Sequence, residues 1–144
     1  SFHVTGVQTC ALSDLYPMID DRSAVRADLD PNVGEFVWTQ ANNYFGWRSL
    51  LGAEPGSPGV SPYAAASRAT DLSGLPPTYI SVGGLDLFLE ENMEFAARLG
   101  RAGVPVEFHL YPGAFHGFYR APRARVTRQA ERDTREALRR FLHG

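Results

Sequence analysis

A strand, a helix and a second strand follow one another within about 34 residues, and this order constrains the fold most strongly. Residues 78–82 are β-branched and aromatic, between a proline and two glycines, which is typical of a buried strand. Residues 89–102 have apolar positions at helical spacing, acids in the first turn and arginines near the end. Val106–Tyr111 alternates apolar and polar residues, as a strand near a sheet edge would. This βαβ unit predicts parallel strands with a right-handed crossover, and therefore an α/β fold.

Further elements are predicted around this unit. Residues 15–19 are short and apolar and are interpreted as the end of a buried strand. Residues 33–51 are rich in aromatics, and their spacing predicts a helix that buries one aromatic face. That face comprises Val37, Ala41, Tyr44 and Phe45. Prolines and glycines make residues 52–62 and 68–77 loops. A long arginine-rich amphipathic helix is predicted over residues 122–142, with its arginines on a solvated face.

Charge and cysteine content exclude several classes of function. The 144 residues include 16 acidic and 14 basic residues, all of the latter arginine, for a net charge of −2. Nucleic acid and an anionic membrane surface are therefore not expected as partners. The single cysteine excludes an internal disulfide framework and a multi-cysteine metal site. No apolar run approaches the roughly 20 residues that span a bilayer. Without a glycine-rich phosphate loop or an H-E-x-x-H segment, no metal or cofactor is expected.

Two polar side chains follow the two strands of the βαβ unit. Asp86 comes after the first strand and two glycines, and His116 comes after the second strand. Because the carboxyl ends of parallel strands meet at one edge of a sheet, these residues are expected to lie close together. A carboxylate bound to one imidazole nitrogen fixes the tautomer and stabilises the imidazolium that forms during proton transfer. Gly113 and Gly117 would let the loop that carries His116 turn tightly.

Each of these residues also has a structural interpretation. Asp86 could be the N-cap of the helix that follows it, and His116 could be a loop histidine hydrogen-bonded to backbone. Their positions at matching strand ends favour the catalytic interpretation. Asp20 and Asp21 precede Arg22 and predict a turn with a local ion pair. A structural or surface role is predicted for His109, and a solvated position for His143. Glu90 and Glu91 are interpreted as first-turn helix acids favoured by the helix dipole, with support of the Asp86 loop as the alternative.

Residues 61–118 closely resemble the C-terminal part of the hormone-sensitive-lipase-like esterases, which have the α/β-hydrolase fold. The most specific segments are VGGLDLFLEE and YPGAFHGF, and the segments LYPMIDDR and NNYFGW fit the same family. The resemblance implies that Asp86 is the acid and His116 the base of a catalytic triad. It further implies hydrolysis of carboxylic esters, usually with short to medium acyl chains, without metal or cofactor. It suggests a substrate pocket that includes Trp38, Phe45, Leu87 and Phe88, with core packing as the alternative.

Two parts of such an esterase are missing from the sequence. The chain order in this fold is serine, acid and histidine, yet no G-x-S-x-G segment precedes Asp86. The His-Gly-Gly segment that supplies oxyanion-hole amides is absent too. The chain is therefore expected to be the C-terminal portion of an α/β-hydrolase domain, over residues 15–144, and to be inactive alone.

The N-terminal segment has an unusual sequence. Residues 4–12, VTGVQTCAL, resemble the translation of a common sequencing adapter. Residues 1–14 are therefore expected to be non-native, and the alternative is a genuine N-terminal strand. A signal peptide would then be unreadable. The compartment stays open, with the cytoplasm favoured.

Two alternative functions remain at this point. One is a fragment of a prolyl-oligopeptidase-type peptidase, which also ends in an aspartate loop and a histidine loop, although the segment LDLFLEE favours the esterases. The other is a non-catalytic hydrolase-like module. The expected partner is a small-molecule ester. Because relatives in the resembling family often dimerise through the last strand, a homodimer through the edge of Val106–Tyr111 is also expected.

Overall fold

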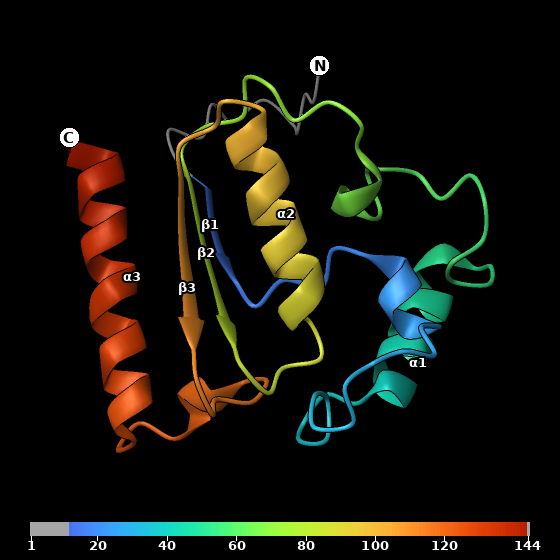
Figure 1. The fold of residues 1–144 in the computed structure, drawn as a ribbon, viewed down its shortest axis with the longest axis horizontal. Helices are drawn as coiled ribbons and strands as arrows, with labels where there is room; N and C mark the ends of the chain where they lie inside the picture. Colours follow the sequence, from blue (N-terminus) through green and yellow to red (C-terminus); the bar gives the residue numbers. More distant parts are fainter. Residues whose placement is uncertain (1–11, 144) are drawn as a thin grey trace.

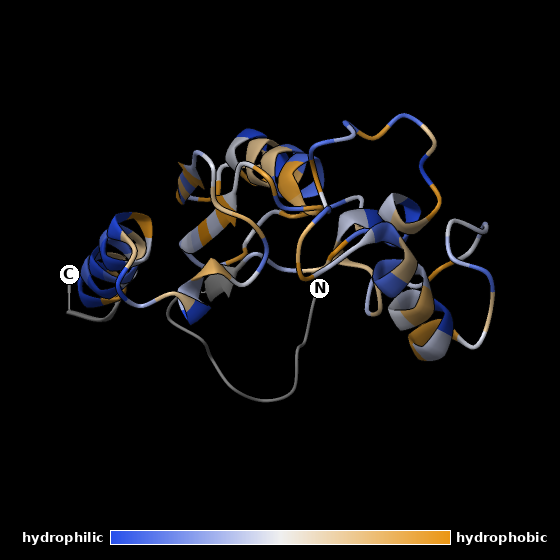
Figure 2. Ribbon diagram, turned by 90° about the horizontal axis from the view of Figure 1, so that it is seen from below, coloured by the Kyte–Doolittle hydropathy of each residue, from blue (hydrophilic) through white to orange (hydrophobic). Residues whose placement is uncertain are grey.

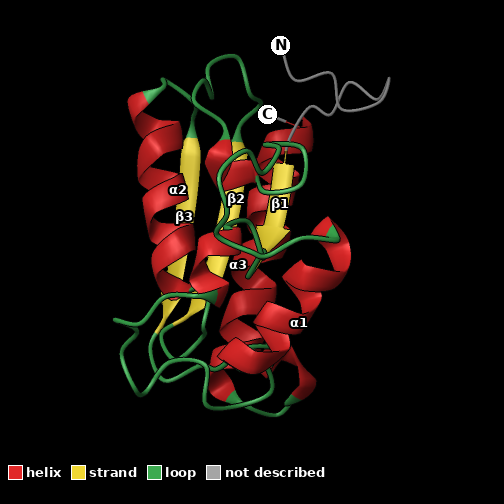
Figure 3. Cartoon of the chain, turned by 90° about the vertical axis from the view of Figure 1, so that its right-hand side faces the viewer, coloured by secondary structure: helices red, strands yellow, loops and turns green. Residues whose placement is uncertain are grey.

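Three parallel strands form the centre of the structure, a computed structural model that describes residues 12–143 (Figure 1). They are β1 (Leu12–Leu15), β2 (Thr78–Gly83) and β3 (Val106–Tyr111), adjacent in that order. In the register, Thr78 pairs with Leu12 on one side and with Val106 on the other. Figure 3 shows the three strands pointing toward the same end of the molecule. The parallel pairing confirms the α/β class and the βαβ unit.

Helices cover both faces of this sheet. α2 (Leu89–Arg101) and α3 (Arg125–His143) lie on opposite faces (Figure 1). α1 (Gln40–Leu51) packs against the 3-10 helix η1 (Asp21–Ala24), to one side of the sheet. The two other 3-10 helices are η2 (Ala66–Arg68) and η3 (Phe118–Arg120). The sheet is thus sandwiched between helices, as in α/β proteins generally.

The central strand anchors the core. Every residue of β2 is buried. Phe95 and Leu99 of α2 pack in one apolar cluster with Ile80 of β2. On the other face, Tyr111 clusters with Ala130 of α3. Burial of each large apolar side chain contributes about 1.5–3 kcal/mol, so these clusters hold the two strand-end loops in fixed positions.

The predicted elements of the βαβ unit agree with the structure within one residue at each end. The long C-terminal helix is also confirmed, although it begins at Arg125 because residues 121–124 form a turn. The strand predicted over residues 15–19 is wrong. β1 ends at Leu15, and Tyr16 has φ +44°, which no strand residue adopts.

The predicted aromatic face of α1 is also wrong. The helix begins at Gln40, where the Thr39 side chain accepts a hydrogen bond from the backbone of Asn42. Its buried face consists of Asn43 and Trp47, whereas Phe45 is 73% exposed. Trp47 packs in a cluster with small side chains from η1 and from residue 65. Because Trp47 packs against this cluster, which is distant in sequence, α1 buries the side that carries Asn43 and Trp47. The apolar spacing alone predicts a different side.

The segment predicted to be non-native lies mostly outside the described residues. Within it, residues 12–14 belong to β1 and pair with β2. The origin of this segment stays a prediction. Over residues 12–143, no helix has the length and apolar character needed to cross a bilayer.

Candidate active site

Two loops meet at the carboxyl ends of β2 and β3, and backbone hydrogen bonds join them. The N–H of Gly84 donates to the carbonyl of Tyr111 at 2.9 Å, and the N–H of Leu85 donates to the carbonyl of Ala114 at 2.9 Å. The approach is close at Gly83, where a Cβ atom would lie 2.3 Å from the carbonyl oxygen of Ala114. Any side chain at residue 83 would therefore force the loops apart.

These loops bring Asp86 and His116 into contact. Oδ2 of Asp86 lies 3.0 Å and Oδ1 lies 3.3 Å from Nδ1 of His116. The Asp86 side chain is fully buried, and that of His116 is 17% exposed. Gly113 and Gly117 both have φ +72°, which is the left-handed turning conformation expected of them. The expected contact is therefore present, while the catalytic role of the pair remains a prediction.

The Asp86 carboxylate also stabilises the start of α2. Its Oδ1 accepts a hydrogen bond from the backbone N–H of Phe88 at 3.0 Å. The N-cap of α2 is Phe88, without a side-chain cap hydrogen bond, so the N-cap position considered for Asp86 is wrong. The Asp86 carboxylate holds the residue at the start of the helix and contacts His116 as well. Within residues 12–143, Nε2 of the imidazole has no hydrogen-bond partner. A histidine held by Nδ1 with Nε2 available can act as a general base.

Three aromatic rings surround the imidazole of His116. Tyr16 and Phe88 make edge contacts with it, at centroid distances of 4.8 Å and 5.3 Å. The Trp38 ring lies 5.8 Å away in a tilted arrangement. The backbone is strained beside two of these rings, with φ +44° at Tyr16 and +65° at Val37. Such strain persists only where the surrounding structure enforces it, and it concentrates at functional sites.

Tyr16 is the site residue that the sequence analysis missed. Burial and, second, the negative charge of Asp86 raise the pKa of the Tyr16 phenol, so this side chain is neutral at physiological pH. Tyr16 directly follows β1, at the same sheet edge as Asp86 and His116. Correct placement of the end of β1 would have included it by the strand-end rule.

The four residues suggested for the substrate pocket occupy different surroundings. Trp38 lies against His116 and is partly exposed. Phe88 is 2% exposed and packs against the imidazole. Leu87 is buried against Gly34, and it borders a separate pocket with Arg26 and Glu94. Phe45 lies on α1, and none of the ring contacts of His116 involves it. Their substrate roles stay predictions.

Glu91 is a second buried carboxylate, and it lies in the first turn of α2 as predicted. Oε1 accepts hydrogen bonds from the backbone N–H groups of Ile19 at 2.8 Å and Asp20 at 3.2 Å. Within the described part of the chain, Oε2 has no hydrogen-bond partner. Burial raises the pKa of Glu91 to about 8 despite these hydrogen bonds. The adjacent Asn92 donates to the carbonyl of Pro17 at 3.0 Å, so α2 holds the segment that follows Tyr16.

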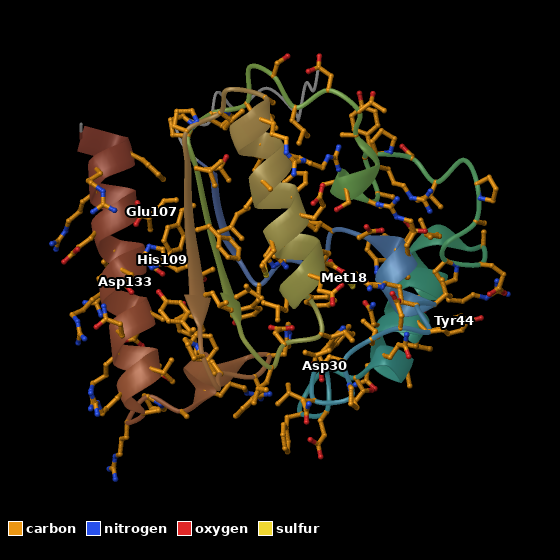
Figure 4. All side chains as sticks on the ribbon, in the orientation of Figure 1. Met18, Asp30, Tyr44, Glu107, His109 and Asp133 are labelled. Carbon is orange, nitrogen blue, oxygen red and sulfur yellow. The ribbon has the colours of Figure 1, made fainter. Side chains whose placement is uncertain are left out.

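The remaining polar candidates are structural. Asp20 forms the expected local ion pair with Arg22 at 2.7 Å. Asp21 is buried and pairs with Arg68 at 2.8 Å, which joins η1 to η2. His109 lies between Glu107 of β3 and Asp133 of α3 (Figure 4), with its Nε2 2.8 Å from the Glu107 carboxylate. Among the side chains that the structure describes, those of residues 16–141, no group of three His, Cys, Asp or Glu could hold a metal ion.

Comparisons with known proteins agree with this fold. The sequence model of a family described as having the alpha/beta hydrolase fold matches residues 5–120. A bacterial heroin esterase superposes with a TM-score of 0.85 and 38% identity, over 96% of this chain and 44% of its own. Brefeldin A esterase, a bacterial homologue of human hormone-sensitive lipase, superposes with a TM-score of 0.77 and 26% identity, over 92% of this chain and 40% of its own.

A curated relative has the same character. An esterase of Acinetobacter venetianus is 38% identical over 65 residues, which is 45% of this chain and 20% of the relative. The chain thus spans less than half the length of each of these three proteins.

Proposed function

Because this chain belongs to the α/β-hydrolase family, among the esterases similar to hormone-sensitive lipase, we propose that it supplies the acid and the base of a serine-hydrolase triad. The observation that carries the proposal is the 3.0 Å contact between Oδ2 of Asp86 and Nδ1 of His116. The proposed reaction is the hydrolysis of a small-molecule carboxylic ester with a short to medium acyl chain. The scheme uses no metal or cofactor.

Proton transfer through His116 is the central step of this scheme. Nε2 accepts the proton of a serine hydroxyl while the hydroxyl attacks the ester carbonyl. His116 then donates that proton to the leaving alcohol, and later takes a proton from the water that releases the acyl group. Asp86 stays ionised throughout and stabilises the imidazolium. Both charged groups lie beside a buried aromatic surface, where their attraction is stronger than in water.

This sequence has neither a G-x-S-x-G nor a His-Gly-Gly segment, which in this fold carry the nucleophile and the oxyanion-hole donors. In this fold, the serine precedes the acid in the chain. We propose that a preceding portion of the hydrolase supplies both. Because oxyanion stabilisation is often the largest catalytic contribution, the 144-residue chain alone should have no measurable esterase activity.

An ester-hydrolysis assay tests whether the chain needs a preceding portion of a hydrolase for activity. The purified chain is assayed with p-nitrophenyl butyrate, alone and after co-expression with the N-terminal portion of the heroin esterase that it resembles. We expect no turnover alone and measurable turnover in the co-expressed pair. His116→Ala should abolish that turnover, and the matched control His109→Ala should retain it.

Two results would contradict the proposal. Turnover by the chain alone that His116→Ala abolishes would show that the chain contains its own nucleophile. Turnover of the co-expressed pair that His116→Ala leaves intact would remove His116 from the mechanism. Cleavage of a prolyl peptide in place of the ester would favour the peptidase alternative.

We also propose a homodimer through the edge of β3. Within the described residues, β3 has a strand partner on one side only, and Leu110 is 42% exposed. An exposed strand edge offers unpaired N–H and carbonyl groups to a second copy. Light scattering after gel filtration should give twice the chain mass, and a monomer at all concentrations would contradict this proposal.

A further inference from the structure

The arginines of this chain fall into two groups. Seven form ion pairs with carboxylates: Arg22, Arg26, Arg48, Arg68, Arg101, Arg135 and Arg140. Arg98 donates to backbone carbonyls. Of the six others, five lie between residues 120 and 132, and they have no ion-pair partner among the described side chains of residues 16–141. They are Arg120, Arg123, Arg125, Arg128 and Arg132. The unpaired positive charge is thus concentrated at one end of α3.

This concentration is unfavourable for the helix itself. No acidic residue occurs between Glu107 and Glu131. Arg125, Arg128 and Arg132 follow one another at spacings of three and four, so their guanidinium groups repel each other on one helix face. Figure 2 shows α3 as predominantly hydrophilic. A solvated face alone would be more stable with alternating charges, as in the following segment, where Arg135 pairs with Glu131.

Three of these arginines line a groove between α3 and the end of β3, with a volume of about 520 Å³. We call it the arginine groove, and its lining residues are Tyr111, Arg125, Val126, Arg128, Gln129 and Arg132. None of them is acidic. Tyr111 and Val126 add apolar surface beside the charges. The groove therefore combines uncompensated positive charge with a surface that can contact an organic group.

Neutral acceptors hold two of the arginines. Nη2 of Arg132 donates to Oε1 of Gln129 at 2.6 Å, and Nη1 of Arg128 donates to the carbonyl of Arg123 at 2.6 Å. These hydrogen bonds restrict the side chains and leave their charge unneutralised. Restricting them before binding lowers the entropy lost when a ligand is bound.

One carboxylate, that of Asp133, contacts the wall of the groove. Asp133 accepts hydrogen bonds from the hydroxyl of Tyr111 at 2.8 Å and from Nε2 of Gln129 at 2.7 Å. Its Oδ2 lies 3.6 Å from Nδ1 of His109. The same contacts position Tyr111 and Gln129 at the groove, so Asp133 supports its wall.

We propose that the arginine groove binds a phosphoryl group carried by a small organic molecule or a lipid headgroup. A guanidinium group donates two parallel hydrogen bonds to phosphate or carboxylate oxygens. A carboxylate has one charge and two oxygens, and it would leave part of this three-arginine set unpaired. A phosphate monoester has up to two charges and three free oxygens, which matches the set better. The net charge of −2 over the whole chain disfavours a long polyanion such as nucleic acid.

NMR titration of the ¹⁵N-labelled chain with inorganic phosphate at low ionic strength tests the proposal. We expect saturable shifts of the Nε–H signals of Arg125, Arg128 and Arg132. Replacing these three arginines by glutamine should weaken phosphate binding about tenfold or more. Binding should also weaken at acidic pH, where the inorganic phosphate is protonated and loses its second charge.

A second triple variant controls for net charge. Arg101→Gln, Arg135→Gln and Arg139→Gln remove the same number of charges from exposed positions outside the groove. This variant should bind phosphate like the wild type. Equal weakening in both variants, or no saturable shift in the wild type, would overturn the proposal.

Sedimentation with vesicles distinguishes the two sources of the phosphoryl group. Vesicles of phosphatidylcholine with phosphatidic acid are compared with vesicles of phosphatidylcholine alone. Co-sedimentation that requires both phosphatidic acid and the groove arginines would identify a lipid headgroup. Phosphate binding without co-sedimentation would identify a soluble phosphate ester. Both results support the groove as a phosphoryl site, and neither depends on the esterase proposal.

Discussion

Two buried carboxylates, those of Asp21 and Glu91, differ in the direction in which their surroundings shift the pKa. At Asp21, burial raises the pKa, but the hydrogen bonds from Arg68 and from the backbone of Gly56 outweigh it, so the pKa is lowered. At Glu91, no cation lies within ion-pair distance in the described part of the chain, and burial dominates. The fold therefore favours ionised Asp21 and protonated Glu91, although both join segments distant in sequence.

Replacement of Glu91 by glutamine should change how stability depends on pH. The pKa of Glu91 is about 8 in the folded chain and 4.5 in the unfolded chain. Its carboxyl group therefore contributes its full share of the free energy of unfolding below pH 4.5, and this contribution is lost as the pH rises through 8. The wild type should therefore lose on the order of 2–4 kcal/mol across that window. Glu91→Gln should remove most of that slope in urea unfolding at several pH values.

The control for this variant is Glu94→Gln, which removes an exposed carboxylate from the same helix. It should keep the wild-type slope. The same slope in the Glu91 variant would mean that this carboxyl group does not bind a proton on folding.

The elements of the βαβ unit could be predicted from sequence because their patterns are local. The helical spacing in α2 matches its buried residues. The alternation in β3 located the strand, although burial does not follow it, since Leu110 is exposed and Tyr111 is buried. The contact of Asp86 with His116 followed from topology, since parallel strands end at one edge. Tyr16 was missed because the apolar residues 15–19 indicate a strand end, whereas β1 ends at Leu15 and Tyr16 has a positive φ. The burial of Glu91 could not be predicted, because acidic residues in the first turn of a helix are usually solvated. The Glu91 carboxylate is buried against the segment of Ile19, which is 72 residues away in the sequence.

The close approach of the two strand-end loops makes glycine necessary at residue 83. Gly83→Ala would bring a methyl group within 2.3 Å of the Ala114 carbonyl oxygen. Separation of the loops should destabilise the chain by roughly 2–4 kcal/mol. Denaturant unfolding measures this loss.

Gly100→Ala is the matched control, because a Cβ atom there meets nothing within 4 Å and the residue lies in α2. This variant should be stabilised by about 0.5–1 kcal/mol. If both substitutions had the same effect, the tight contact between the loops would be contradicted.

At the scale of the whole molecule, a three-stranded sheet with helices on both faces brings Asp86 and His116 together at one edge. The chain covers less than half of the length of each of the two esterases with which it superposes. Its sequence contains Asp86 and His116 but no G-x-S-x-G segment. The outer helix α3 adds an arginine groove that this esterase chemistry does not use. The proposed chemistry depends on the tautomeric state of the His116 imidazole beside Asp86.

That state can be measured directly by NMR of the histidine ring nitrogens, with the imidazole neutral. We predict that Nδ1 of His116 carries the proton and that Nε2 is unprotonated. Asp86→Asn should shift this tautomer balance, whereas Asp71→Asn, at an exposed loop position, should leave it unchanged. A proton on Nε2 in the wild type, or an identical tautomer in the Asp86 variant, would contradict the claim that Asp86 prepares His116 as a base.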